Sequence, residues 1–239
     1  MSCASSNSVQ TAKPIVNHLI SVPARGSLVF LGVSGPQLKP ELEVEAARED
    51  AARKVSMYHG LTASFSNVQG SGSNALEYYS DLNFQLEYNT QLDPYKERLT
   101  HDPERDVSHG DNMVYILFSY PGTYPVSINY TSAKERDGSP EWIKSPPLEI
   151  GGFMAQVGFA RRQYRLRDTI ARSSEDAIAQ LIARSSSSMS TSDISRNELS
   201  SSFFTQQSRG RLLNFMILET WIDLKDLSVW TLTVAKSAN

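Results

Sequence analysis

Two stretches of this chain carry the same order of features: a proline-led segment, a short apolar run and an amphipathic helix. The later stretch runs from Pro140 to Ser185, and a looser version runs from Pro14 to Gly60. A shift of 126 residues places Glu175-Asp176-Ala177 on Glu49-Asp50-Ala51 without a gap. A helix that packs on a small sheet buries the apolar faces of both, so a repeated strand–helix pattern predicts an α+β fold.

Two helices are predicted from apolar residues spaced three and four apart. The first begins at Pro40 and ends before Gly60, and its stripe comprises Val44, Ala47, Ala51, Val55 and Tyr58. The second has Asp168 as its expected N-cap, and its stripe comprises Ile170, Ala171, Ser174, Ala177, Ile178, Leu181 and Ile182. Each helix follows an apolar run whose next-to-last residue is glycine, Gly32 in the first copy and Gly158 in the second.

Strands are expected where apolar runs or alternation stop at turn residues. The expected strands are 27–33, 61–68, 112–120, 153–159, 213–224 and 228–236, with 185–195 as a serine-rich edge strand. Residues 74–90 fit a helix or a strand, 93–111 read as a polar loop, and 197–208 as a helical turn or two. We therefore expect two tandem two-layer modules, each a small, mostly antiparallel sheet covered by one main amphipathic helix. Their bounds are 13–137, with an insertion, and 138–239, after a flexible tether at 1–12.

Composition narrows the class of protein. Hydrophobic residues make up 40% and charged residues 21%, as in ordinary globular proteins, and the net charge of −3 argues against nucleic-acid binding. The single cysteine, Cys3, excludes an intramolecular disulfide and a multi-thiolate metal site. A small polar tract follows Cys3, as in a mature lipoprotein, although the alternative of an ordinary exposed thiol is left open by the residues.

A set of motifs resembles the bacterial twenty-kilodalton lipoprotein (Lpp-twenty-type) family and the related N-terminal domain of the flagellar T-ring assembly protein. The residues that carry it are Pro140–Ile143, Pro146-Pro147, Val157-Gly158, Glu175–Leu181, Glu219–Asp223 and Val229–Leu232. The resemblance covers about residues 138–236, while the first half matches only through its strand and helix. It implies a lipoprotein of the bacterial periplasm or outer membrane without enzymatic chemistry, anchored through Cys3. Our own hypothesis is that the protein acts by protein–protein contact or self-association.

Polar clusters supply the candidate sites. His101 and His109, with acidic neighbours in 101–111, are candidate ligands of a metal, and this loop is the basis of an alternative function as a ligand- or metal-binding module. Because no second-shell support is evident, we interpret it as a solvated loop and predict no metal or cofactor. The residues show no G-x-S-x-G motif, and we predict no catalytic site.

The second helix is preceded by a run of arginines, at the helix end where positive charge is disfavoured. Arg161, Arg162, Arg165 and Arg167 are the candidate partner contacts. The first helix carries the opposite charge at the equivalent place, in Glu41, Glu43, Glu45, Glu49 and Asp50. We hypothesise that the two patches meet, within one chain or head-to-tail between chains. The tryptophans at 142, 221 and 230 are expected to be core or seam residues.

Overall fold

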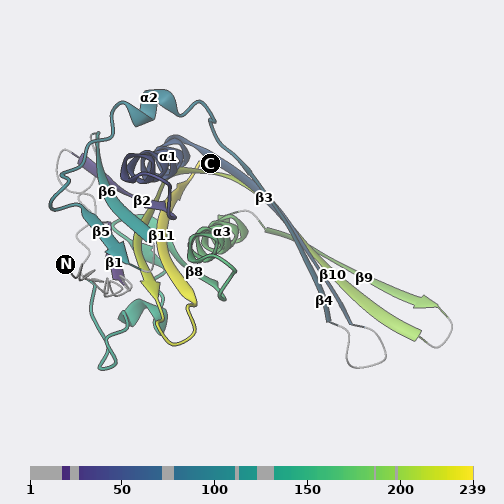
Figure 1. Ribbon diagram of the computed structural model, residues 1–239. Helices are drawn as coiled ribbons and strands as arrows, with labels where there is room; N and C mark the ends of the chain where they lie inside the picture. Colours follow the sequence, from purple (N-terminus) through teal and green to yellow (C-terminus); the bar gives the residue numbers. More distant parts are fainter. Residues whose placement is uncertain are drawn as a thin grey trace, which may run out of the picture.

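The computed structural model describes residues 18–21, 27–71, 78–110, 113–122, 132–185, 187–196 and 199–238. For 65–71, 78–83, 187–196 and 199–208 it describes the backbone alone. The chain forms a mixed α+β structure, as the sequence predicts (Figure 1). Its helices are α1 (Pro40–His59), α2 (Asp93–Lys96) and α3 (Leu166–Ser185), with a 3₁₀ turn at Glu141–Ile143. None of these described helices has the length and apolar character needed to cross a membrane.

The strands of the described residues form two sheets, and all pairings are antiparallel. The smaller sheet has the order β2 (Ser27–Ser34), β6 (Met113–Pro121), β5 (Val107–Gly110). The larger has the order β4-β3-β10-β11-β8-β7, and β1 and β9 also pair with β10. Its strands are β1 (His18–Ile20), β3 (Leu61–Ser71), β4 (Tyr78–Glu87), β7 (Glu149–Ile150), β8 (Phe153–Ala160), β9 (Ser187–Arg196), β10 (Leu199–Ile222) and β11 (Val229–Ser237).

Strand β10 pairs with four other described strands, β1, β3, β9 and β11. It is 24 residues long, so different parts of it can pair with different neighbours. Its first part lies between β9 and β3, and its last part pairs with β11 and with the short N-terminal strand β1. Helices α1 and α3 both contact β10, so elements from both halves of the sequence meet on this one strand.

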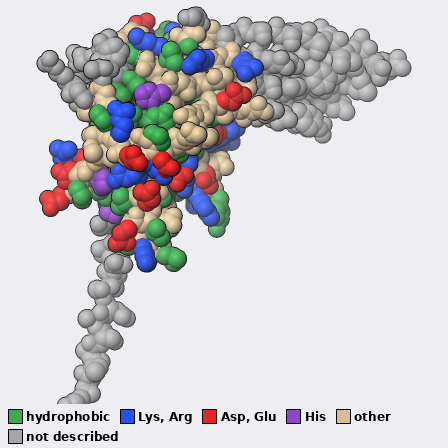
Figure 2. Space-filling model, turned by 90° about the horizontal axis from the view of Figure 1, so that it is seen from above, with side chains coloured by type: hydrophobic (Ala, Val, Ile, Leu, Met, Phe, Trp, Pro, Cys, Tyr) green, Lys and Arg blue, Asp and Glu red, His purple; other side chains and the backbone are tan. Residues whose placement is uncertain are grey.

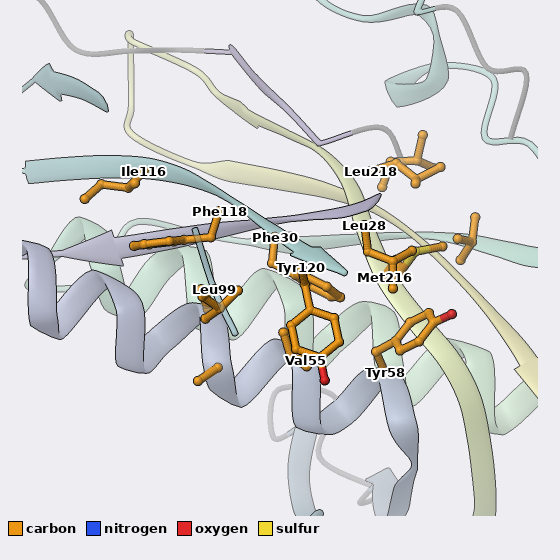
Figure 3. Close-up of a cluster of buried hydrophobic side chains, with 14 of the residues drawn as sticks. Leu28, Phe30, Val55, Tyr58, Leu99, Ile116, Phe118, Tyr120, Met216 and Leu218 are labelled. Atoms are coloured by element: carbon orange, nitrogen blue, oxygen red, sulfur yellow. The ribbon is translucent and has the colours of Figure 1, made fainter. Parts of the chain in front are cut away.

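A core of buried side chains joins the two halves of the sequence (Figure 3). The first half supplies aromatic residues of the smaller sheet and the alanines of α1. The second half supplies residues of β10 and β11, among them Met216, Leu218, Leu232 and Val234. The predicted stripe of α1 is confirmed, because Ala47, Ala51, Val55 and Tyr58 are buried and Val44 packs against them.

The pairs β2–α1 and β8–α3 have matching bounds. Ser27 and Phe153 begin the strands and Pro40 and Leu166 begin the helices, and each pair of positions is 126 residues apart. The side-chain contacts also correspond. The carboxylate of Asp50 accepts the backbone N–H of Val33 at 3.0 Å, and that of Asp176 accepts the N–H of Phe159 at 2.9 Å. A helix carboxylate therefore ties the end of the preceding strand in both places.

A close approach of helix to strand recurs at the same two positions. A Cβ atom added at Gly32 would overlap the carbonyl oxygen of Ala47, and one added at Gly158 would overlap that of Ser173. Glycine is therefore required for packing at each strand, because a methyl group has no room.

Several sequence predictions are wrong in detail. Asp168 is not an N-cap, because α3 begins at Leu166 and places Asp168 in its first turn. Residues 199–208 belong to β10 rather than to a helical turn, because they pair with strands on both sides. The polar stretch 93–111, expected as a loop, includes α2 and β5. Residues 78–87, within the stretch left open between helix and strand, form β4, which is the strand alternative. At 199–208 and in β4, pairing with neighbouring strands outweighs local propensity.

Candidate interaction surfaces

Four strands form an arm that extends away from the helices (Figure 1). Two hairpin-like pairs build it, β3 with β4 and β9 with β10, and β3 joins β10 between them. The order across the arm is therefore β4-β3-β10-β9. Among the described residues, β4 pairs only with β3 and β9 pairs only with β10. The arm thus has one edge strand at each side.

The serine-rich stretch is the edge strand that the sequence predicts. Strand β9 (Ser187–Arg196) pairs with β10 in an unbroken register from Ser187↔Ser208 to Arg196↔Leu199. Its ten residues and the ten residues of β4 make both edges long. A long edge strand presents a row of backbone N–H and C=O groups to any further strand of suitable direction.

The predicted arginine patch lies where β8 leads into α3. Arg161, Arg162 and Arg165 are exposed in the connecting loop, and Arg167 is half-buried in the first turn of the helix. Within the part of the chain that the structure describes, no ion pair joins any of these four to a carboxylate. Arg172, further along α3, pairs with Glu175 at 3.0 Å.

Three acidic residues of α1, Glu45, Glu49 and Asp50, form ion pairs with basic residues near them. Asp50 lies 2.7 Å from the Nζ atom of Lys54, and Glu49 lies 3.6 Å from Arg53. A carboxylate oxygen of Glu45 lies 3.8 Å from the Nζ atom of Lys96, the last residue of α2. Figure 2 accordingly shows acidic and basic side chains side by side on the face seen from above. Within the described residues no ion pair joins the acidic patch of α1 to the arginine patch. A contact between these patches of two different chains stays a prediction.

A cavity of about 430 Å³ separates α1 from α3. Side chains of both helices, of β10 and of the end of β4 line it. Its apolar lining comprises Val33, Met57, Leu86, Tyr88, Ile170, Ala171, Ile178, Phe215 and Ile217. Its polar lining comprises Asp50, Arg53, Lys54, Arg167, Asp168, Ser174 and Glu175. Ala171 and Ser174, expected in the buried stripe of α3, are exposed and half-buried because they face this cavity.

A buried carboxylate that sequence reasoning did not single out ties three segments together. Glu219 on β10 is fully buried, and its Oε2 atom accepts the indole N–H of Trp142 at 2.9 Å. The same oxygen accepts the hydroxyl of Ser132 at 2.9 Å and lies 2.6 Å from the ring of His18 on β1. The signal in the sequence is the pair of motifs Pro140–Ile143 and Glu219–Asp223, which this hydrogen bond connects.

The tryptophans lie in the core or at its margin, as expected. Trp142 is buried, whereas Trp221 and Trp230 are half-buried and are partners in the register of β10 and β11. Trp230 also packs on Phe159, with ring centroids 4.2 Å apart.

The two histidines of the 93–111 stretch, His101 and His109, differ in their surroundings. His101 is half-buried, with its ring 5.1 Å from that of Phe118, and His109 is exposed on β5. Between them, a hydrogen bond from Arg105 lowers the pKa of Asp106, whose carboxylate also accepts the N–H of Asp102. Among the residues that the structure describes, no three His, Cys, Asp or Glu side chains gather in an arrangement suited to a metal ion. Asp111 and the lipidation candidate Cys3 lie outside the described residues.

Comparison with known proteins gives no relative from which a function could be carried over. No protein-family model matches the chain, and no curated protein or solved structure matches it either.

Proposed function

We propose that this protein is a non-enzymatic assembly module of the bacterial cell envelope, which associates with further copies of itself through the edges of its arm. The observation that carries the proposal is the pair of long edge strands, β4 and β9, on opposite sides of the arm. The envelope location and an anchor at Cys3 rest on the lipoprotein resemblance of residues 138–236. Two tandem α+β modules of common origin, supported by the matching contacts at an offset of 126 residues, form its body.

Strand direction makes such an assembly possible. Neighbouring strands across β4-β3-β10-β9 alternate in direction, so β4 and β9 run oppositely. When a second copy is placed beside the first in the same orientation, its β4 therefore runs antiparallel to the β9 of the first copy. Such a contact joins two different surfaces, and it repeats from copy to copy until a ring closes.

Pairing of β4 with β9 between copies would satisfy the backbone N–H and C=O groups along both edge strands. Each added pair of edge residues exchanges water for an interstrand hydrogen bond, which contributes about 0.5–1.5 kcal/mol. Natural proteins usually cover, shorten or charge an edge of this length. Across β9, which reads SSMSTSDISR, only Asp193 and Arg196 are charged, so the strand carries little charge to deter pairing.

Cysteine cross-linking tests the arrangement. In a Cys3→Ser background, Ser80→Cys on β4 is combined with Ser192→Cys on β9, and a second pair uses Ser80→Cys with Ser190→Cys to allow for register. Oxidation or a short bis-maleimide is expected to give a ladder of dimers, trimers and larger species on denaturing gels. Each single-cysteine variant, as matched control, yields dimers at most.

Two results would contradict the head-to-tail pairing of β4 with β9. A double variant that stays monomeric, together with a monomeric mass in sedimentation with and without detergent micelles, overturns the proposal. Efficient dimers from Ser192→Cys alone, with no ladder from the pairs, would instead show a two-fold contact of β9 with β9 and would reject the head-to-tail arrangement.

A further inference from the structure

The cavity between α1 and α3 has the size and lining of a small-molecule site, and we propose that it binds a single-chain amphiphile with an anionic head group. Its volume of about 430 Å³ lies within the range of roughly 300–1,000 Å³ that is typical of ligand pockets. It also lies where elements of both halves of the chain meet, the position that such pockets favour. At roughly 30 Å³ for each water-sized group, it has room for an acyl chain of about a dozen carbons.

The floor and walls of the cavity suit an acyl chain. The apolar lining includes Phe215 and Ile217 of β10, Met57 of α1, and Ile170 and Ile178 of α3. Leu86, near the end of β4, also lines the cavity. Burial of each methylene group against such a surface contributes about 0.8 kcal/mol, so a chain of this length gains most of its affinity from the lining.

The charged groups around the cavity are mostly paired already. Asp50 is held by Lys54 at 2.7 Å and by Arg53 at 3.6 Å. Glu175 is held by Arg172 at 3.0 Å. Asp168 is exposed to solvent and needs no partner.

Arg167 is the exception on this rim. Its side chain is half-buried, and no carboxylate of the described residues lies within ion-pair distance of it. Arg161, Arg162 and Arg165 precede it within the same seven residues but do not line the cavity, so Arg167 is the member of this run placed to contact a bound anion. A guanidinium forms paired hydrogen bonds with either a carboxylate or a phosphate, and these are the two head groups that the site would accept.

Calorimetric titration of the whole chain tests the site, with dodecanoate, dodecyl phosphate and dodecyltrimethylammonium as probes below their micelle concentrations. We expect one site per chain and at least about tenfold tighter binding of the anionic probes than of the cation. The two anions distinguish a carboxylate from a phosphate ligand. Equal binding of all three probes, or no saturable binding, overturns the proposal.

Three variants locate the binding. Arg167→Gln is expected to weaken dodecanoate binding about tenfold, which is the loss of one charged hydrogen-bonding partner. Ala171→Phe fills the cavity from an exposed position and is expected to abolish binding of every probe. Arg162→Gln, the matched control, removes the same charge from the exposed run outside the cavity lining and is expected to change the affinity less than threefold. If Arg162→Gln and Arg167→Gln act alike, the effect is general electrostatics and the site is rejected; thermal melts confirm that each variant is folded.

Discussion

Glu219 illustrates how a single residue can hold distant segments in place. A carboxyl group is costly to bury unless hydrogen bonds replace those that it made with water. Here the donors come from the indole of Trp142 and the hydroxyl of Ser132, with the ring of His18 on the same oxygen. The N-terminal strand and the segment before β7 are thereby fixed to the central strand β10.

Removal of one donor should therefore destabilise the fold more than removal of an equal volume elsewhere. Trp142→Phe deletes the N–H that Glu219 accepts, and we expect the free energy of unfolding to fall by about 2–3 kcal/mol. Trp230→Phe makes the same change at a half-buried site where the ring packs on Phe159, and we expect a loss of about 1 kcal/mol or less. Urea unfolding of the two variants measures the difference, and equal losses would contradict the role of the hydrogen bond.

At the scale of the element, the distance between helix and strand is set by glycine. The α3 backbone approaches β8 so closely at Gly158 that a Cβ atom would overlap the carbonyl oxygen of Ser173 and crowd Ala177. Gly158→Ala is therefore expected to lower the free energy of unfolding by at least about 2 kcal/mol, because α3 must move away from the sheet. Gly32→Ala should act similarly on α1.

Gly35→Ala is the matched control for these two substitutions. An added Cβ at Gly35 meets no atom within 4 Å, so we expect a change within about 0.5 kcal/mol. Chemical denaturation of the three variants side by side gives the comparison. Comparable stability of Gly158→Ala and Gly35→Ala would show that the helices can shift freely and that close packing does not determine the repeat.

The sequence predicts the elements that local pattern controls, and it misses the first part of β10, where pairing decides the conformation. The α1 stripe and its ends follow from spacing, Pro40 and Gly60, and the structure confirms them. The first part of β10, which reads LSSSFFTQQS, has no strong strand pattern, and its conformation comes from β9 and β3 on either side. The cavity could not be predicted at all, because Met57, Leu86 and Phe215 meet only through the tertiary fold.

For the whole molecule, the interdependence of the two halves has a thermodynamic consequence. Strand β10 belongs to the second half, yet it pairs with β3 over Ser202–Leu212 and with β1 over Glu219–Trp221. The main core likewise contains Phe30 and Val55 from the first half with Met216 and Leu218 from the second. Separation of the halves would expose these apolar side chains and break both strand pairings, at about 25 cal/mol for each Å² of apolar surface.

We therefore expect that residues 138–239 alone do not fold, although they include a complete strand–helix unit. Circular dichroism and amide NMR of that fragment should show a largely unfolded chain. Addition of a fragment covering 1–137 should restore a cooperative thermal transition, because the second fragment supplies β1, β3 and α1 to the exposed side of β10. A fragment 138–239 that melts cooperatively by itself would contradict this expectation and would show that each module is an autonomous domain.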